Sequence, residues 1–270
     1  IVGFARPVSS WICESKSART VAGDAARAVQ AARAAPGGIA TLILPADTAW
    51  NAADHAAGPL PDIGPAAVAS DAIEAAARRL VNGKKTALLL RGTALHGAGL
   101  EAAGRVQAKT GVRLLCDTFA PHAELGAGRV PVERIPYFAE QIVAFLAGLE
   151  QIILVGSKPP VSFFAYPGKP SWCAPEACEF SHLALPHENG AAALQSLADA
   201  LGAPSQSPIR IPLLLPELPS GALNAASAAQ IIAHLTPENA IFAEEAATSG
   251  LPLLMHLARA RPHTHLPLTG

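Results

Sequence analysis

Short apolar runs alternate with segments of helical periodicity through the middle of the chain. Thr86–Leu90, Val112–Thr118 and Gln151–Val155 are mainly apolar and short enough to be buried strands. The other predicted elements are the strand Leu183–Leu185 and the helices Ser70–Asn82, Leu100–Thr110, Pro136–Leu149 and Gly190–Leu201. Alternating strands and helices are typical of a doubly wound parallel sheet. The pattern therefore predicts an α/β fold, with a complete Rossmann-like central domain at residues 66–203.

Two further α/β segments flank this central domain. Proline-rich linkers are predicted at residues 51–65 and 204–219, because repeated prolines interrupt helices and sheet interiors. The flanking elements are a helix at Thr20–Ala35, a strand at Ile39–Leu44, a helix at Ala225–Leu235, a strand at Ala240–Glu244, a helix at Leu251–Ala260 and a strand at His265–Leu268. Residues 1–50 contain one strand with no predicted partner, and residues 220–270 stop after two strands. Both segments are expected to be parts of domains.

Composition narrows the classes of partner. Half of the residues are apolar and 15% are charged, but no apolar run reaches the roughly 20 residues of a membrane span. The formal net charge is −1, and Lys and Arg form no stripe, so neither a membrane nor a nucleic acid is the expected partner. The four cysteines form no CxxC pair, which favours free thiols in a reducing, cytoplasmic compartment.

A glycine-rich loop follows the first strand of the central domain. Gly92, Gly97 and Gly99 lie between that strand and the next helix, where backbone amides can approach a phosphate. Asp117 ends the next strand, where a dinucleotide-binding fold often has a ribose-binding carboxylate. The loop lacks the GxGxxG spacing, so the alternative is a tight turn without a ligand. Nucleotide binding and a structural turn both remain open.

A second polar loop, Glu244–Gly250, joins a buried strand to a helix. Its hydroxyls and free amides could bind an anion, and its paired carboxylates could serve acid–base chemistry. The alternative is that Thr248 or Ser249 caps the following helix. His263 and His265 alternate and would share a strand face, but with no acid or cysteine beside them they are expected to be surface or interface residues. No metal site or catalytic residue is predicted.

The order of these segments resembles thiamine diphosphate-dependent enzymes of the acetolactate synthase and benzoylformate decarboxylase group. Those enzymes have a pyrimidine-binding, a central and a diphosphate-binding domain, in that order. The matching stretches are Arg6–Trp11, Ile39–Asp47, Ala75–Ala203, Glu238–Gly250 and His265–Gly270. The chain starts with Ile1 and has only Met255 as methionine, so it is expected to be an internal piece of such an enzyme.

The resemblance implies particular site residues. Ala247, Thr248 and Ser249 match the loop that contacts the cofactor diphosphate, and Gly270 lies at the turn that meets the aminopyrimidine. Thiamine diphosphate and Mg²⁺ are the implied cofactors, and FAD is not expected. The family's activating glutamate would precede Ile1, and its Gly-Asp-Gly metal motif would follow Gly270. The chain alone is therefore expected to be inactive.

The implied reaction is decarboxylation of a small 2-oxo acid followed by carboligation, in a homodimer or homotetramer. One alternative is a simple 2-oxo acid decarboxylase such as benzoylformate decarboxylase. Another is that the central domain serves as a nucleotide-binding regulatory module or a structural spacer.

Overall fold

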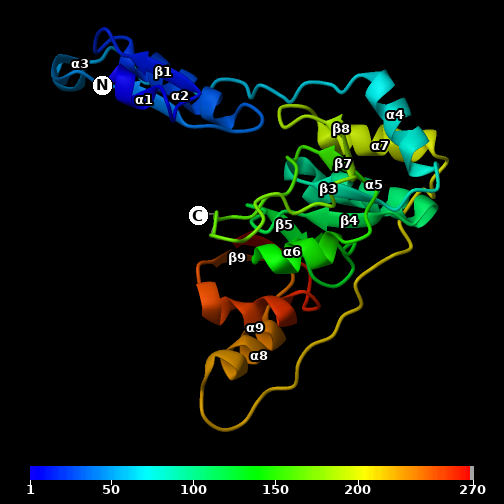
Figure 1. The fold of residues 1–270 in the computed structure, drawn as a ribbon. Helices are drawn as coiled ribbons and strands as arrows, with labels where there is room; N and C mark the ends of the chain where they lie inside the picture. Colours follow the sequence, from blue (N-terminus) through cyan, green and yellow to red (C-terminus); the bar gives the residue numbers. More distant parts are fainter. Residues whose placement is uncertain (268–270) are drawn as a thin grey trace. The chain divides into compact units, whose positions relative to one another are not determined.

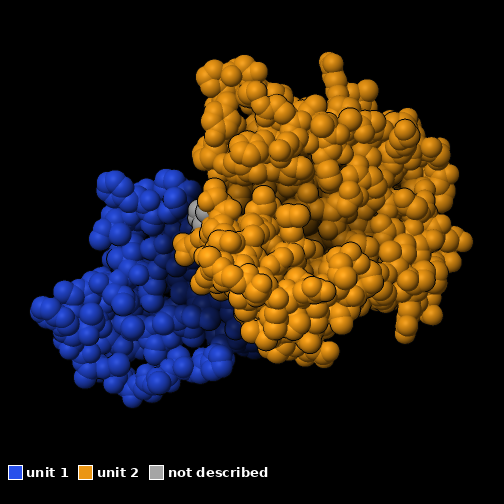
Figure 2. Space-filling model, turned by 90° about the horizontal axis from the view of Figure 1, so that it is seen from below, with its two compact units in different colours: residues 1–66 blue, residues 67–270 orange. Residues whose placement is uncertain are grey.

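The computed structural model describes residues 1–267, with the side chain of Ala247 excepted, and the chain forms two compact units (Figures 1 and 2). The first unit, residues 1–66, contains α1 (Val2–Ala5), β1 (Trp11–Glu14), α2 (Val21–Arg33), β2 (Ala40–Ile43) and α3 (Ala46–Trp50). Strand β2 was predicted to lack a partner, but it pairs in parallel with β1, from Trp11 opposite Ala40 to Glu14 opposite Ile43. That prediction was wrong because a four-residue strand is too short to show periodicity.

The second unit, residues 67–270, contains a five-stranded sheet in the order β6-β4-β3-β7-β8, and every pairing in it is parallel. Its strands are β3 (Thr86–Leu90), β4 (Arg113–Cys116), β6 (Glu133–Arg134), β7 (Gln151–Val155) and β8 (Glu179–Ala184). Its helical elements are α4 (Ser70–Leu80), the 3-10 helix η1 (Gly92–Leu95), α5 (Gly97–Thr110), α6 (Ala139–Leu146) and α7 (Gly190–Ala200). The predicted doubly wound parallel sheet is confirmed.

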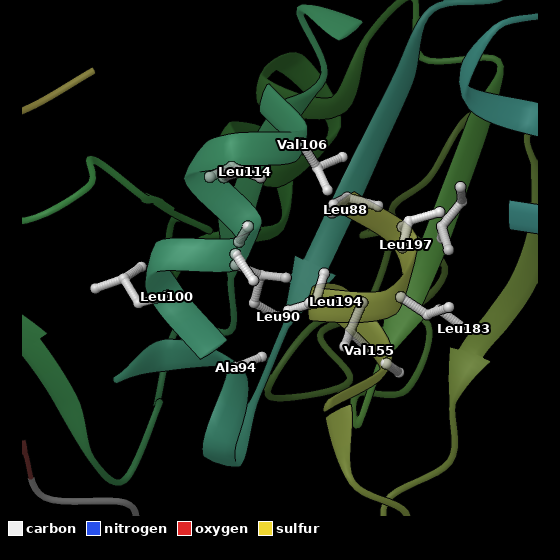
Figure 3. Packing of buried hydrophobic residues seen from close by; sticks show 14 of the residues in the cluster. Leu88, Leu90, Ala94, Leu100, Val106, Leu114, Val155, Leu183, Leu194 and Leu197 are labelled. Carbon is white, nitrogen blue, oxygen red and sulfur yellow. The ribbon is translucent and has the colours of Figure 1, made fainter. Parts of the chain in front are cut away.

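Alternation along the strands builds a core on each face of this sheet. Leu88 and Leu90 of β3 point to the face covered by α4, α5 and α7, where Val106 lies beside Leu88 and Leu194 beside Leu90 (Figure 3). Leu89 points to the opposite face, which α6 covers. Each such fully buried leucine contributes about 1.5–3 kcal/mol of hydrophobic stabilisation. The continuous apolar runs in the sequence are thus explained by burial on both faces.

Residues 220–267 contribute two strands to a smaller sheet, and its third strand comes from the central part. Its elements are α8 (Ala225–Leu235), β9 (Ala240–Glu244), α9 (Ala247–Leu257) and β10 (His263–Pro267). Strand β10 pairs in parallel with β9 and antiparallel with β5 (Ala123–Leu125). Residues 204–219 connect the two parts without helix or strand. The segment beyond this connection is therefore anchored to the central part through β5.

Candidate functional site

The order of the central sheet places a topological switch point between β3 and β7. From β3 the chain passes through α5, on one face of the sheet, to β4 on one side of β3. It later passes through α6, on the opposite face, to β7 on the other side of β3. Ligands of open α/β sheets bind outside the carboxyl ends of strands at such a point. Here the Arg91 amide donates to the Val155 carbonyl at 3.0 Å, and Ser157 Oγ donates to the Leu89 carbonyl at 2.7 Å. Main-chain and hydroxyl contacts thus join the carboxyl ends of β3 and β7.

The three glycines of the loop after β3 have different roles. Gly92 and Gly97 have φ values of +57° and +53°, in the left-handed region that glycine tolerates, and a side chain at either would meet open space. At Gly99, a Cβ atom would lie 2.1 Å from the Thr93 carbonyl oxygen and 3.0 Å from Ala191 Cβ. Gly99 is therefore required for packing α5 against the preceding turn and α7. Gly92 and Gly97 are required for the backbone turn.

Asp117 reaches the same edge of the sheet, from the carboxyl end of β4. Its Oδ2 atom accepts a hydrogen bond from Arg91 Nη1 at 2.5 Å. Burial raises the pKa of the Asp117 carboxyl, and the Arg91 guanidinium partly opposes that change. A ribose hydroxyl would have to share this carboxylate with Arg91. The structure thus brings Gly92, Gly97 and Asp117 to neighbouring strand ends and leaves the nucleotide hypothesis untested.

The second predicted loop is the connection from β9 to α9. The helix begins at Ala247, so Thr248 and Ser249 both lie in its first turn. The interpretation that one of them caps the helix is wrong: the N-cap is Ala246, which makes no side-chain capping hydrogen bond. Ser249 Oγ instead donates back to the Ala246 carbonyl at 2.8 Å. Pattern reasoning missed the early start because it began the helix at the first large apolar residue, Leu251.

Two features leave this turn open to an anion. The side chains of Thr248 and Ser249 are exposed, and the Thr248 hydroxyl has no hydrogen-bond partner among the described residues. The Ser249 amide in this turn already donates to the Ala246 carbonyl at 3.0 Å, but the helix dipole favours negative charge at the helix N-terminus. Glu244 Oε1 already accepts from the Ala246 amide at 2.7 Å, so one carboxylate lies beside this turn.

Two buried histidines adjoin the same loop. His263 and His265 are 1% and 2% exposed, so the prediction that they lie on a surface was wrong. They share one face of β10, as their alternation indicated, and the Nε2 atom of each is buried with no hydrogen-bond partner among the described atoms. His265 Nε2 lies 3.9 Å from Glu244 Oε2. Burial, the Arg134 charge and His263 lower the pKa of His265 to about 4. Both imidazoles are therefore neutral at pH 7.

The remaining predicted residues give little further chemistry. The backbone of Ala247 starts α9, and Gly270 lies outside the described residues. Within residues 1–267, no group of three or more His, Cys, Asp or Glu side chains could hold a metal ion.

The cysteines have free thiols, and burial raises the pKa of Cys116 to about 12. No helix in the described part is long and apolar enough to cross a membrane.

Sequence comparison gives one informative relative. The chain is 42% identical, over its whole length, to the "Putative acetolactate synthase large subunit IlvX" of Mycobacterium tuberculosis. The match takes in 52% of that protein, so the chain spans about half the length of the curated relative. No protein-family profile matches the chain.

Comparison with solved structures shows a shared fold. A "putative thiamin diphosphate-dependent enzyme" from Mycobacterium smegmatis matches with a TM-score of 0.70, 18% identity, 98% of this chain and 54% of the other. The 4-hydroxybenzoylformate decarboxylase of Rhodococcus jostii RHA1 matches with a TM-score of 0.69, 15% identity, 98% of this chain and 53% of the other. Together with the sequence relative, these matches confirm the resemblance to thiamine diphosphate-dependent enzymes.

Proposed function

We propose that this chain is part of a thiamine diphosphate-dependent enzyme of the acetolactate synthase type. Such an enzyme removes CO₂ from a small 2-oxo acid. It then joins the remaining carbon unit, which reacts as a carbanion equivalent, to a second 2-oxo acid. The observation that carries the proposal is the 42% identity, sustained over the whole chain, to a protein described as an acetolactate synthase large subunit. The match to thiamine diphosphate enzymes along 98% of the chain gives it independent support at the level of fold.

The first turn of α9 is the proposed contact to the cofactor diphosphate. The helix dipole at the start of α9 and the exposed hydroxyl of Thr248 suit phosphate oxygens. Ser249 Oγ donates to the Ala246 carbonyl, so it would have to turn away to donate to a phosphate. Thiamine diphosphate, when bound, supplies a carbanion that attacks the 2-oxo group and a ring that accepts the electrons released with CO₂.

Glu244 limits how this turn can bind a diphosphate. Its carboxylate accepts from the Ala246 amide and would repel a bound anion at short range. A divalent cation such as Mg²⁺ would offset that repulsion and takes oxygen ligands in near-octahedral geometry. We therefore propose that Mg²⁺ ligands come from outside the described residues, and that the 270-residue chain is inactive alone. The full enzyme is proposed to be a cytoplasmic homodimer or homotetramer. That it binds no flavin stays a prediction.

A simple 2-oxo acid decarboxylase is the second candidate. The fold matches at TM-scores of 0.69 and 0.65 to benzoylformate-type decarboxylases favour it. The two candidates differ in product: a decarboxylase releases an aldehyde, whereas a synthase releases an acetohydroxy acid.

The test uses the longer natural protein that contains this chain, supplied with thiamine diphosphate, Mg²⁺ and pyruvate. Acetolactate supports the first candidate, and acetaldehyde supports the second. Thr248→Ala should weaken cofactor binding by about 1 kcal/mol or somewhat more, because a hydrogen bond to a charged acceptor is lost. Thr264→Ala, on the neighbouring strand β10, is the matched control and should bind normally. Failure of the longer protein to bind the cofactor, or equal binding by both variants, would exclude the proposed contact.

A further inference from the structure

Aromatic side chains are concentrated in one place outside the core. The chain has eight Phe, two Tyr and three Trp residues, and none of its buried core residues is aromatic. Both tyrosines and half of the phenylalanines form a single cluster of ring contacts. The members of this aromatic cluster are Phe119, Tyr137, Phe138, Phe163, Phe164 and Tyr166. Phe145 and Phe180 pack against the core of the central part, but core packing does not account for the position of this aromatic cluster.

All members of the cluster except Phe119 line a cavity of about 230 Å³. Phe163 is its centre, with ring centroids 5.1 Å from Phe119, 5.8 Å from Tyr137 and 4.7 Å from Phe164. Separations of 4.5–7 Å are favourable for aromatic rings. Phe138, Phe163 and Phe164 are nevertheless 57%, 49% and 50% exposed. Half of the ring surface thus remains free for another group.

The cluster lies where ligands of this architecture bind. Phe119 follows the carboxyl end of β4, Tyr137 and Phe138 follow that of β6, and Phe163 to Tyr166 follow that of β7. Carboxyl ends of parallel strands lie at one edge of a sheet, and that edge is the usual binding edge of open α/β sheets. An ion pair between Lys169 and Glu140 lies at the rim, and both residues line the cavity.

We propose that this aromatic cavity binds the planar ring of a small aromatic molecule. An apolar cavity of about 150 Å³ is enough for benzene, so a cavity of 230 Å³ has room for one ring and a substituent. The wall rings offer stacking and edge-to-face contacts that a non-planar apolar group could not make equally well. The Lys169 ammonium beside the cavity is paired with Glu140, so an acidic substituent on the ring would have to replace that carboxylate as its partner. An aromatic carboxylic acid and a nucleotide base share this chemistry. The proposal is independent of the diphosphate contact at α9.

Saturation-transfer NMR and calorimetry on the 270-residue chain test the proposal with three probes. Benzoate presents an aryl acid, adenosine monophosphate presents a nucleobase, and cyclohexanecarboxylate presents the same acid on a non-planar ring. We expect saturable binding of benzoate or of adenosine monophosphate, and the stronger of the two identifies the source of the ring. Cyclohexanecarboxylate should bind at least about threefold more weakly than benzoate if benzoate is the stronger ligand.

Leucine variants separate ring contacts from general apolar contact. Phe164→Leu and Tyr166→Leu should each weaken binding about three- to tenfold, because each keeps apolar volume but loses one ring. Trp172→Leu is the matched control: Trp172 lies in the same connection, is 47% exposed and packs edge-on against Phe180, outside the cavity.

Four results would overturn the proposal, and the first three concern ligand binding. They are no saturable binding of either aromatic probe, equal binding of the cyclohexyl acid, and unchanged binding in both cavity variants. A fourth is a concentration-dependent dimer of the wild-type chain, detected by light scattering, that the cavity variants abolish while Trp172→Leu does not. That result would assign the exposed rings to a contact between two copies of the chain.

Discussion

Acidification should destabilise the second unit through His265. This side chain is 2% exposed on β10, and its pKa is lowered to about 4, first by burial and then by Arg134 and His263. Glu244 acts in the opposite direction, but its oxygen is 3.9 Å from Nε2, beyond hydrogen-bond distance. We therefore expect the neutral imidazole to persist in the folded protein well below pH 6.

The sign follows from the two pKa values. The unfolded chain takes up a proton on His265 near pH 6.5, whereas the folded chain does so only near pH 4. Stability from the neutral imidazole is thus fully present above pH 6.5 and is lost as the pH falls toward 4. The full difference corresponds to about 3 kcal/mol, of which about 2 kcal/mol should be lost by pH 5. Burial also lowers the pKa values of His263 and His96, which adds loss in the same direction.

Urea unfolding at pH 7.5 and pH 5.0 measures this loss. Trp11 and Trp50 should first be replaced by Phe, so that the fluorescence of Trp172 reports on the second unit alone. His265→Gln, which cannot titrate, should reduce the pH-dependent loss by about 2 kcal/mol. His187→Gln, at an exposed position, should leave it unchanged. An undiminished loss in His265→Gln would refute the reasoning, because other groups would then cause the loss. A parent chain that is more stable at pH 5.0 would also refute it and would indicate that Glu244 holds a proton on His265.

Three further outcomes follow from packing and charge. Gly99→Ala should lower the free energy of unfolding by about 1–3 kcal/mol or more, because the new Cβ would overlap the Thr93 carbonyl. Gly23→Ala, whose Cβ would meet open space in α2, should raise the free energy of unfolding by up to about 1 kcal/mol. Thermal melts of the two variants measure both changes. Cys116 should resist alkylation at pH 8 while half-buried Cys13 reacts, as mass spectrometry of the labelled peptides can check. The 270-residue chain should show no micromolar binding of thiamine diphosphate with Mg²⁺, and a calorimetric titration that saturates in that range would contradict this expectation.

The sequence predicted best those elements whose own residues decide their structure. Thr86–Leu90, Gln151–Val155 and Ala225–Leu235 have the predicted bounds, since each is an apolar or periodic run between polar residues. The end of α5 at Thr110 also matches the predicted helix, and Gly111 follows it with a φ of +72° in the left-handed region. Serine is a typical N-cap residue, yet Ser70 is the first residue inside α4, and the N-cap is Ala69 without a side-chain bond. Which residue caps a helix depends on the backbone conformation of a single turn, and the amino-acid composition does not determine that conformation.

Non-local pairing explains the elements that sequence reasoning missed. Strands β5 and β6 have three and two residues, and each exists because a distant strand pairs with it. The burial of His265 has the same origin, since Ala123 of β5 lies opposite it. Periodicity within a segment carries no information on such partners. The candidate site at Thr248 was located by resemblance, whereas its place in the first turn of α9 required the structure.

The distribution of exposed apolar side chains separates the central part from its flanks. Every residue of Gln151–Val155 in the central sheet is buried, whereas Ile241 on β9 and Met255 on α9 are each 70% exposed. In the first unit, Phe4 and Trp50 are 90% and 87% exposed. Contiguous exposed apolar surface is unusual in a soluble monomer and marks a contact surface. Because the chain spans about half of its curated relative, we expect the other half of such a protein, or a second subunit, to cover these flanking faces.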